Sequence, residues 1–311
     1  MRRVALSASR LGSALFLVLT ALLASLPGSP PPAQAHALGS FAVQCGWTHT
    51  SMDDPIVHPD DPGASHKHAF YGNKSTNALS TRQTMMAAGT TCTDKKDLAA
   101  IWAPTASLKK GGEWRYVKPY RERTYYFPAI RDNIAPVTNI PKNLKVIGGN
   151  MMAMSSKENP HVFWYCGEGS PERPYPYDCR SYTLPKEDGF RAVINMPYCW
   201  DGKNTDSPDH MSHVVYANRK TGTCPDDHPK YLPQITVRIH FLLKDPCAGA
   251  TPCGPNSGGG HVKLKLSSGP YWTMHADFWN TWRQRRLNEL TTTCLRHHKD
   301  CGILGVETTD V

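Results

Sequence analysis

The stretch from Ile235 to Leu243, ITVRIHFLL, is the clearest sign of the fold class of this chain. Its β-branched and aromatic residues alternate with Thr236, Arg238 and His240, and a two-residue period is typical of a β-strand. Similar short runs recur at residues 41–45, 145–147, 191–196, 213–216 and 261–266. Clusters of Gly, Pro, Asn and Asp separate them, and the chain has 26 prolines. This pattern predicts a β-rich domain, mainly antiparallel and sandwich-like, with long loops.

Helical periodicity is scarce, and one segment near the C-terminus carries it. A spacing of three to four residues runs through residues 277–294, where it joins Trp279, Trp282, Arg286, Leu290 and Cys294. We therefore expect one C-terminal α-helix, from about Asp277 to Cys294. No internal repeat is visible.

The N-terminus has the pattern of a secretory signal peptide. Arg2 and Arg3 precede an apolar run from Leu11 to Leu26, and Ala33-Gln34-Ala35 is a small-x-small cleavage site. We expect a signal peptide over residues 1–35 and a single exported domain over residues 36–311. No later stretch reaches the roughly 18 apolar residues of a transmembrane helix. The sequence therefore predicts a secreted protein, with association with the cell wall as a further possibility.

The charge balance is mildly basic. The net charge of the whole chain is +9, and removal of residues 1–35 leaves 32 basic against 26 acidic residues, a net charge of +6. The surplus is spread along the chain, without the basic stripe of a nucleic-acid reader, so we expect no nucleic-acid partner. An anionic cell-wall polymer is compatible with this charge. We expect a monomer.

Ten cysteines follow the signal segment, and an even count in an exported chain indicates disulfides. Proximity in sequence suggests three pairs, which are Cys247–Cys253, Cys294–Cys301 and Cys166–Cys179. Cys45, Cys92, Cys199 and Cys224 would then pair among themselves, in an order that the sequence leaves open. A cysteine–metal site is disfavoured because the chain has no CxxC pair.

Histidines gather in short polar clusters, and neutral imidazole is the commonest metal ligand. His66 and His68 are two residues apart, and so are His275 and Asp277, so each pair would share one face of a strand. We predict that these four residues bind a divalent metal ion. The alternatives are a hydrogen-bonded loop for the first pair and a helix N-cap role for Asp277.

A second polar cluster lies between residues 200 and 213. We predict catalytic roles for Asp206, Asp209, His210 and His213, with the histidines on one face of a helical turn. Capping of that turn by the aspartates is the alternative. Just before them, we predict substrate-binding roles for Trp200 and Asp201; tryptophans stack on sugars, although they are more often core residues. We expect His66 or His68, His210 or His213, and His275 to meet in one cleft.

These motifs resemble an exported family known only as domain of unknown function nineteen-ninety-six, from actinobacteria and filamentous fungi. The resemblance rests on five stretches of the sequence: Asp54-Pro55-Ile56-Val57; Gly63 to His68 with Gly72-Asn73; Cys199 to Asn204 with Asp206 to His210 and Ser212-His213; Cys224-Pro225 with His228-Pro229; and His275 with Asp277 and Trp282. It covers most of residues 41–301. Asp60 is a departure, since the family more usually has Gly there. The family implies no activity, but some fungal relatives are fused to modules thought to bind carbohydrate.

Two functions are consistent with these residues. The first is an exported metal- or histidine-dependent hydrolase of polysaccharide or another envelope polymer, with the His and Asp residues in one site. The second is a non-catalytic cell-wall or carbohydrate-binding domain, with the same residues as a polar scaffold and aromatic side chains as the contacts. Converging histidines favour the first, and an exposed aromatic platform favours the second.

Overall fold

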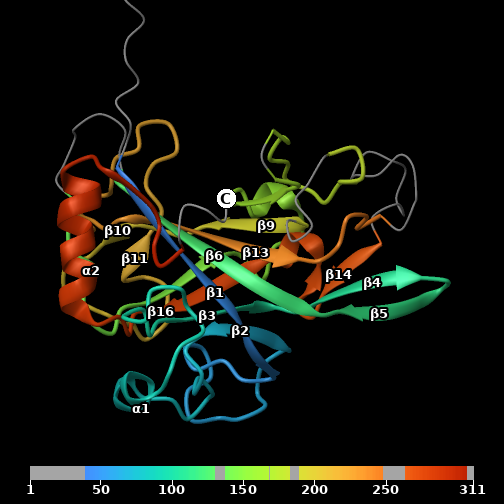
Figure 1. The fold of residues 1–311 in the computed structure, drawn as a ribbon, viewed down its shortest axis with the longest axis horizontal. Helices are drawn as coiled ribbons and strands as arrows, with labels where there is room; N and C mark the ends of the chain where they lie inside the picture. The colour runs from blue at the N-terminus through green and yellow to red at the C-terminus, as the bar shows by residue number, and fades with distance from the viewer. Residues whose placement is uncertain (1–38, 130–136, 168, 183–188, 248–262, 307–311) are drawn as a thin grey trace, which may run out of the picture. The chain divides into compact units, whose positions relative to one another are not determined.

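The structure is a computed structural model that describes residues 39–129, 137–167, 169–182, 189–247 and 263–306 (Figure 1). Ala37–Val311 form one compact unit by their backbone contacts. The signal peptide expected over residues 1–35 lies outside the described residues and stays a prediction.

Short strands dominate the described part of the chain, as the alternating runs predict. In chain order the strands are β1 (Ser40–Ser51), β2 (His68–Gly72), β3 (Ala100–Pro104), β4 (Ala106–Lys110), β5 (Glu113–Val117), β6 (Pro119–Phe127), β7 (Lys145–Gly149), β8 (Val162–Tyr165), β9 (Phe190–Asn195), β10 (Cys199–Trp200), β11 (Val214–Val215), β12 (Lys230–Tyr231), β13 (Gln234–Phe241), β14 (Leu264–Leu266), β15 (Gly269–Pro270), β16 (His275–Trp279) and β17 (Asp300–Ile303). The helices are α1 (Arg82–Ala87), α2 (Gln284–Leu290) and three short segments, η1 (Ser156–Glu158), η2 (Tyr271–Thr273) and the π-helical η3 (Thr291–Arg296).

The main sheet follows the order β7-β16-β3-β2-β1-β6-β13-β9-β8, and all of these neighbours are antiparallel; β17 adds to β1 in parallel. Strand β1 joins its two halves, because residues 41–46 pair with β6 and residues 47–51 pair with β2. The far ends of the halves meet again at Gly148, where a Cβ would lie 3.0 Å from Met196 and 3.2 Å from Ile194. The prediction of a mainly antiparallel, sandwich-like fold is therefore confirmed.

The half formed by β2, β3, β16 and β7 buries side chains on both faces. Ala69, Ile101, Ala276 and Phe278 point into the large core between the halves. The alternate residues point outward into a second, smaller core of Ile56, Phe70, Met85, Ala100, Trp102 and Trp279. The segment that follows β1 supplies Ile56 and so covers this outer face. Polar residues on the outer face, including His68 and Asp277, are thereby removed from solvent.

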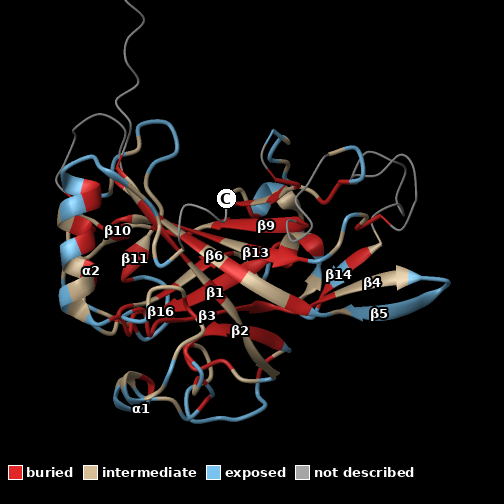
Figure 2. Cartoon of the chain, viewed as in Figure 1, coloured by how far each residue is buried: buried red, intermediate tan, exposed pale blue. Residues whose placement is uncertain are grey.

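A smaller sheet of order β15-β14-β4-β5 carries a hairpin that projects from the main body (Figure 1). Strand β5 is exposed over most of its length, whereas β9 and β13 are largely buried (Figure 2). The third sheet, β11-β10-β12, has three two-residue strands around Cys199.

The predicted C-terminal helix exists but begins later than expected. Its N-cap is Arg283, and the residues from His275 to Trp279 form strand β16 between β3 and β7. Trp279 and Trp282 satisfied a helical spacing, yet they belong to different cores, the small one and the large one respectively. The start at Asp277 was therefore wrong, and Asp277 is a strand residue rather than an N-cap. Helix α1, with a Thr81–Thr84 capping box, was not predicted.

Four disulfides lie in the described residues. Cys166–Cys179 and Cys294–Cys301 confirm two of the predicted pairs, and the four cysteines left open pair as Cys45–Cys92 and Cys199–Cys224. Cys247 is also disulfide-bonded, but Cys253 lies outside the described residues. Such a set of disulfides fits an extracellular protein. In the described ranges, no helix has the length and apolar character needed to cross a membrane.

Candidate metal centre

Three histidines meet on the outer face of the β2–β3–β16 half-sheet. His68 is the first residue of β2, His275 is the first residue of β16, and His66 lies in the loop just ahead of β2. The register of β3 with β2 places His68 opposite Pro104, and the register of β3 with β16, continued by two pairs beyond Asp277 and Trp102, places His275 on the other side of Pro104. The ring centroids lie 4.2 Å (His66–His68), 5.1 Å (His66–His275) and 5.7 Å (His68–His275) apart.

The hydrogen bonds of two of these rings fix which nitrogen carries the proton. Nδ1 of His68 donates to the backbone oxygen of Asp53 at 2.9 Å, and Nδ1 of His275 donates to that of Thr273 at 2.9 Å. Each Nε2 is therefore left with a lone pair while the ring is neutral. The Nε2 atoms of His66, His68 and His275 are all buried and have no hydrogen-bond partner among the described residues.

Burial keeps these imidazoles neutral. It lowers the pKa of His68 to about 3, and the neighbouring His66 adds to the effect. Burial likewise lowers the pKa of His275 to about 3, with His68 as the next cause. The pKa of His66 is lowered by burial, which the Asp54 carboxylate partly offsets. Neutral rings with unused lone pairs are the form of histidine that binds metal ions.

Two buried carboxyl groups adjoin the imidazoles. Asp277 is on β16, two residues from His275, and its Oδ2 lies 4.0 Å from His275 Nε2 without a hydrogen-bond partner. Burial, and next the nearby Asp54 carboxyl, hold the pKa of Asp277 well above its ordinary range. Asp54 is also buried, and its Oδ1 accepts from the backbone N–H groups of Ile56 and Val57 at 3.0 Å.

The ligand geometry of these five residues fits a cation. Within the described part of the chain, one nitrogen from each of His66, His68 and His275 lies within 4.8 Å of the others, and the same holds for the ligand atoms of Asp54, His68 and Asp277. Zinc–nitrogen bonds of about 2.0–2.1 Å would place tetrahedral ligand atoms about 3.4 Å apart, so a small contraction suffices. A third group, Cys45, Cys92 and Asp97, is not a ligand set because both cysteines are in a disulfide.

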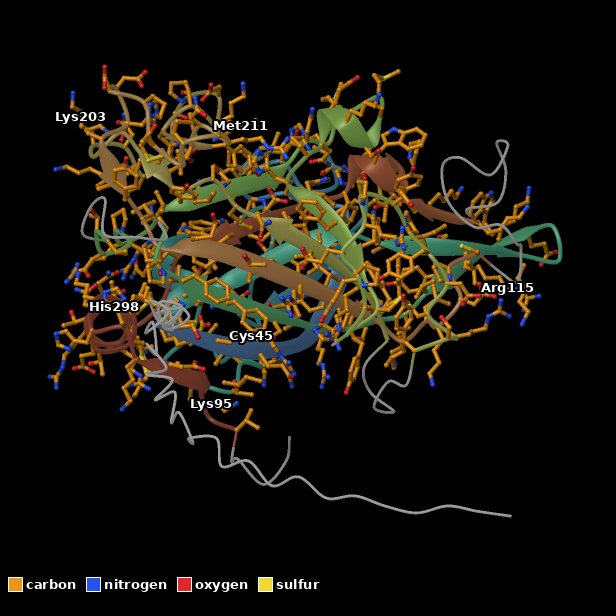
Figure 3. All side chains as sticks on the ribbon, turned by 90° about the horizontal axis from the view of Figure 1, so that it is seen from above. Cys45, Lys95, Arg115, Lys203, Met211 and His298 are labelled. Carbon is orange, nitrogen blue, oxygen red and sulfur yellow. A yellow bond between two sulfur atoms is a disulfide. The ribbon has the colours of Figure 1, made fainter. Side chains whose placement is uncertain are left out.

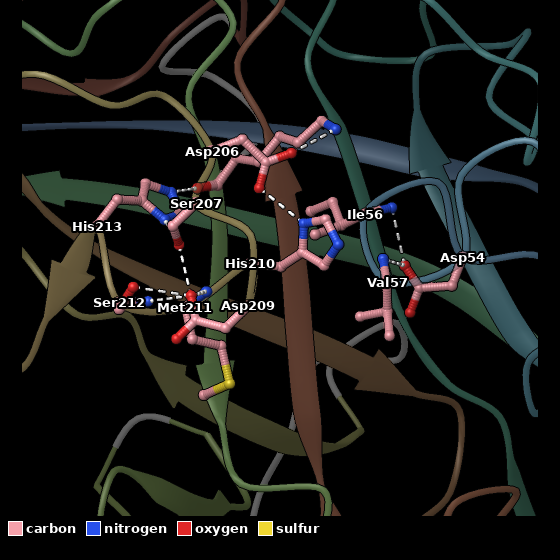
Figure 4. Close-up of polar contacts among 11 residues, drawn as sticks. Asp54, Ile56, Val57, Asp206, Ser207, Asp209, His210, Met211, Ser212 and His213 are labelled. Carbon is pink, nitrogen blue, oxygen red and sulfur yellow. Dashed lines mark hydrogen bonds and ion pairs between the residues drawn. The ribbon is translucent and has the colours of Figure 1, made fainter.

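The second predicted cluster has a different arrangement (Figure 4). A single oxygen of Asp209, Oδ1, accepts from Ser207 Oγ, Ser212 Oγ and the backbone N–H groups of Met211 and Ser212. These bonds hold the pKa of Asp209 well below its ordinary range. Asp206 accepts from Lys145 Nζ at 2.8 Å and from His210 Nδ1 at 2.8 Å. Burial alone would raise its pKa, but these two bonds outweigh burial and lower it.

Both ring nitrogens of His213 are engaged. Nε2 donates to the backbone oxygen of Lys145 at 2.7 Å, and Nδ1 lies 2.9 Å from Ser207 Oγ. Lys145 pairs with Trp279, the last residue of β16, whereas His275 is its first residue. Roughly 13 Å of strand therefore separates His275 from the position at which His213 binds Lys145. His66, His68 and His275 thus meet as expected, whereas His213 is bound elsewhere on the same sheet.

The two residues predicted to bind substrate are parts of a turn. The carboxylate of Asp201 accepts from the backbone N–H groups of Lys203 and Asn204 and from Asn204 Nδ2. Trp200 donates its indole N–H to the backbone oxygen of Asn204 and is half-buried. Their contacts close the turn after β10.

A model of the family described as Domain of unknown function (DUF1996) matches residues 54–282. The chain belongs to the DUF1996 family. The matched segment runs from Asp54 to beyond Asp277 and therefore contains all five residues of the candidate centre. Asp60, where the family more usually has Gly, adopts a φ of 60°, a left-handed conformation that Asp tolerates better than most residues. No curated protein and no solved structure matches the chain.

Sequence reasoning selected four of these five residues and missed Asp54 as a candidate ligand. The signal was present, because Asp53-Asp54-Pro55 precedes the first histidine cluster. The role of Asp53 was not visible in the sequence, since it holds His68 through its backbone oxygen rather than its side chain.

Proposed function

We propose that this DUF1996 protein binds one divalent cation through His66, His68 and His275, with a carboxylate of Asp277 or Asp54 beside it. The observation that carries the proposal is the convergence of three buried, unpartnered Nε2 atoms from neutral rings. An unsatisfied buried polar atom costs about 1–3 kcal/mol, so several at one point need a ligand to explain them. Three imidazoles suit zinc in particular.

We further propose that the centre serves hydrolysis of an extracellular polysaccharide or envelope polymer. A zinc ion held by three imidazoles supplies a bound water whose pKa is near 7. The backbone oxygens of Asp53 and Thr273 orient His68 and His275 from behind. His66 is the least buried of the three histidines.

Asp277 is the residue proposed to move a proton. Burial raises its pKa and so favours its protonated form, whereas a positive charge beside His275 would favour its carboxylate form. A carboxyl group with two accessible protonation states can act as general acid or base. Asp54, held by two backbone N–H groups, is the carboxylate suited to a fixed charge.

For the loop from Asp206 to His213 we propose a structural role in place of the catalytic one suggested by the sequence. Asp209 and His213 use their polar atoms within the loop or on Lys145. We propose a structural role for Asp201 as well, because its carboxylate accepts from backbone N–H groups of its own turn. His210 is the exception, because its Nε2 has no hydrogen bond among the described residues and its side chain is partly exposed.

The test is metal analysis of purified protein, followed by assay on a panel of polysaccharides with and without a chelator. We expect one equivalent of zinc per chain, abolished by His275→Ala, and chelator-sensitive release of reducing ends. Protein without bound metal after incubation with zinc would refute the centre. One equivalent of metal without turnover on any polymer would favour the non-catalytic binding domain, which the exposed Trp114 and Tyr116 also support.

A further inference from the structure

The projecting hairpin gathers aromatic and lysine side chains on one face. Strand pairing places Trp114 opposite Lys109 and Tyr116 opposite Ser107, and Ser107 in turn opposite Lys265. Residues directly opposite across a sheet point to the same side, so these five side chains form one surface, the aromatic–lysine face. Trp114 is 43% exposed and Tyr116 is 50% exposed, among the largest exposures of any aromatic residue in the described chain.

The lysines lie against the tryptophan ring. Lys265 Nζ is 4.4 Å and Lys109 Nζ is 5.9 Å from the centroid of Trp114. The carboxylate of strand β5, Glu113, points to the opposite face, where it lies 3.9 Å from Arg115. The aromatic–lysine face therefore combines flat apolar rings with uncompensated positive charge, which suits a ligand that has both a ring and a negative group.

This face begins beside the candidate metal centre. Tyr116 Oη lies 3.3 Å from Thr50 Oγ1, and Thr50 and Ser51 pair with Ala69 and His68. At the base of the hairpin, the backbone N–H of Thr105 and the hydroxyl of Ser267 both donate to the backbone oxygen of Lys67, which stands between His66 and His68. Thr50 lies opposite Ala69, so Tyr116 meets the sheet on the face opposite to the one that carries the His68 side chain.

We propose that the aromatic–lysine face binds an acidic polysaccharide whose repeating sugars carry carboxylates. Sugar rings pack on Trp114 and Tyr116, and the carboxylates face Lys109 and Lys265. A membrane is disfavoured because the lysines hold the indole against the sheet and the rest of the face is polar, whereas surface insertion needs a broad apolar face.

The hairpin supplies its own matched control. Arg115 lies on the hairpin (Figure 3), between Trp114 and Tyr116 on β5, and is also exposed, but strand alternation turns its side chain to the other face. Arg115→Gln therefore removes the same charge as Lys265→Gln from the other face of the same small sheet. Figure 3 also shows Arg115 well away from Met211 in the loop that contains His210 and His213.

The experiment is calorimetric titration of the full chain with an oligogalacturonate and with its methyl ester, in which the sugars are kept and the charge is removed. We expect binding of the acid form, at least about tenfold weaker for the ester, about tenfold weaker in Trp114→Ala, and several-fold weaker in Lys265→Gln. Arg115→Gln should change the affinity less than twofold. His275→Ala should bind the oligosaccharide as well as wild type, which separates this face from the metal centre.

Several results would overturn the proposal. These are no binding of the acid form by wild type, equal binding of acid and ester, or equal losses in Arg115→Gln and Lys265→Gln. Tighter, Trp114-dependent binding to vesicles with anionic lipid or to a single-stranded DNA oligonucleotide would assign the face to another partner. If oligosaccharide binding behaves as expected but His275→Ala keeps its metal, the binding face stands and the proposed centre fails.

Discussion

The histidine cluster at residues 66, 68 and 275 and the loop from Asp206 to His213 contain the same residue types, but their hydrogen bonding differs. In the loop, Asp209 and His213 each bind several groups of the loop itself or of Lys145. In the cluster, three Nε2 atoms and Asp277 Oδ2 are buried without a partner. Residue composition alone therefore does not separate the two regions, and the unsatisfied atoms are what favour ligand binding at the cluster.

The largest expected difference between the two regions concerns metal binding. Zinc at 100 times its dissociation constant should raise the free energy of unfolding of the chelator-treated protein by about 2.7 kcal/mol. The variant His275→Ala should lose this stabilisation, because one of three nitrogen ligands is absent. Thermal unfolding with and without zinc measures it. His210→Ala is the control that should keep the full response, and an equal loss in both variants would contradict the distinction between the regions.

The next effect is on stability without metal. His213→Ala should lower the free energy of unfolding by about 3 kcal/mol, because the buried oxygen of Lys145 loses its hydrogen bond from the ring, Ser207 keeps only Asp209 as a partner, and a cavity remains. Urea denaturation in the presence of chelator measures this loss. A His213→Ala variant with wild-type stability and no activity would instead show that His213 has a catalytic role.

The dependence of stability on pH sharpens the comparison. The folded pKa of His275 is about 3, against an ordinary value of 6.5. Below pH 6.5 the unfolded chain binds a proton that the folded chain does not, so the stability from this residue is complete above pH 6.5 and falls towards pH 3, by about 1.4 kcal/mol per pH unit. Asp206, whose pKa is lowered from 3.8, loses its contribution only below about pH 4.

Between pH 6 and pH 4.5, the chelated wild type should therefore lose stability more steeply than His275→Gln, by about 1.4 kcal/mol per pH unit. The opposite contribution of Asp277, whose pKa is raised by burial, remains in both proteins. Urea denaturation at half-unit pH intervals gives the two slopes. Parallel slopes would mean that His275 is not held neutral in the folded chain.

The smallest effect is expected for His210. Its ring is partly exposed and its single hydrogen bond is to Asp206, which keeps Lys145 as a second partner, so His210→Ala should cost about 1 kcal/mol or less. Urea denaturation is again the measurement. Loss of hydrolysis without loss of stability in this variant would show that the loop takes part in the chemistry after all.

Much of the fold was predictable because it follows from local pattern. Alternation in residues 235–243 and 191–196 corresponds to β13 and β9, and two disulfides followed from short sequence separations. The start of the C-terminal helix was not predictable, since Trp279 and Trp282 fit a helical spacing while packing in different cores. The pairing of Cys45 with Cys92 depends on the approach of β1 to a distant loop, which no local pattern encodes.

For the site, the sequence by itself determined which residues were candidates for metal binding: two histidines at 66 and 68, and a histidine and an aspartate at 275 and 277. Only the tertiary structure decided that they meet, because the pairing of β3 with both β2 and β16 brings together segments about 200 residues apart. The tertiary structure also separated the cluster from the loop at 206–213, whose hydrogen bonds are made within itself and to Lys145. The physical reason is that side-chain identity is local, whereas burial and the presence of a partner depend on what the rest of the chain places alongside.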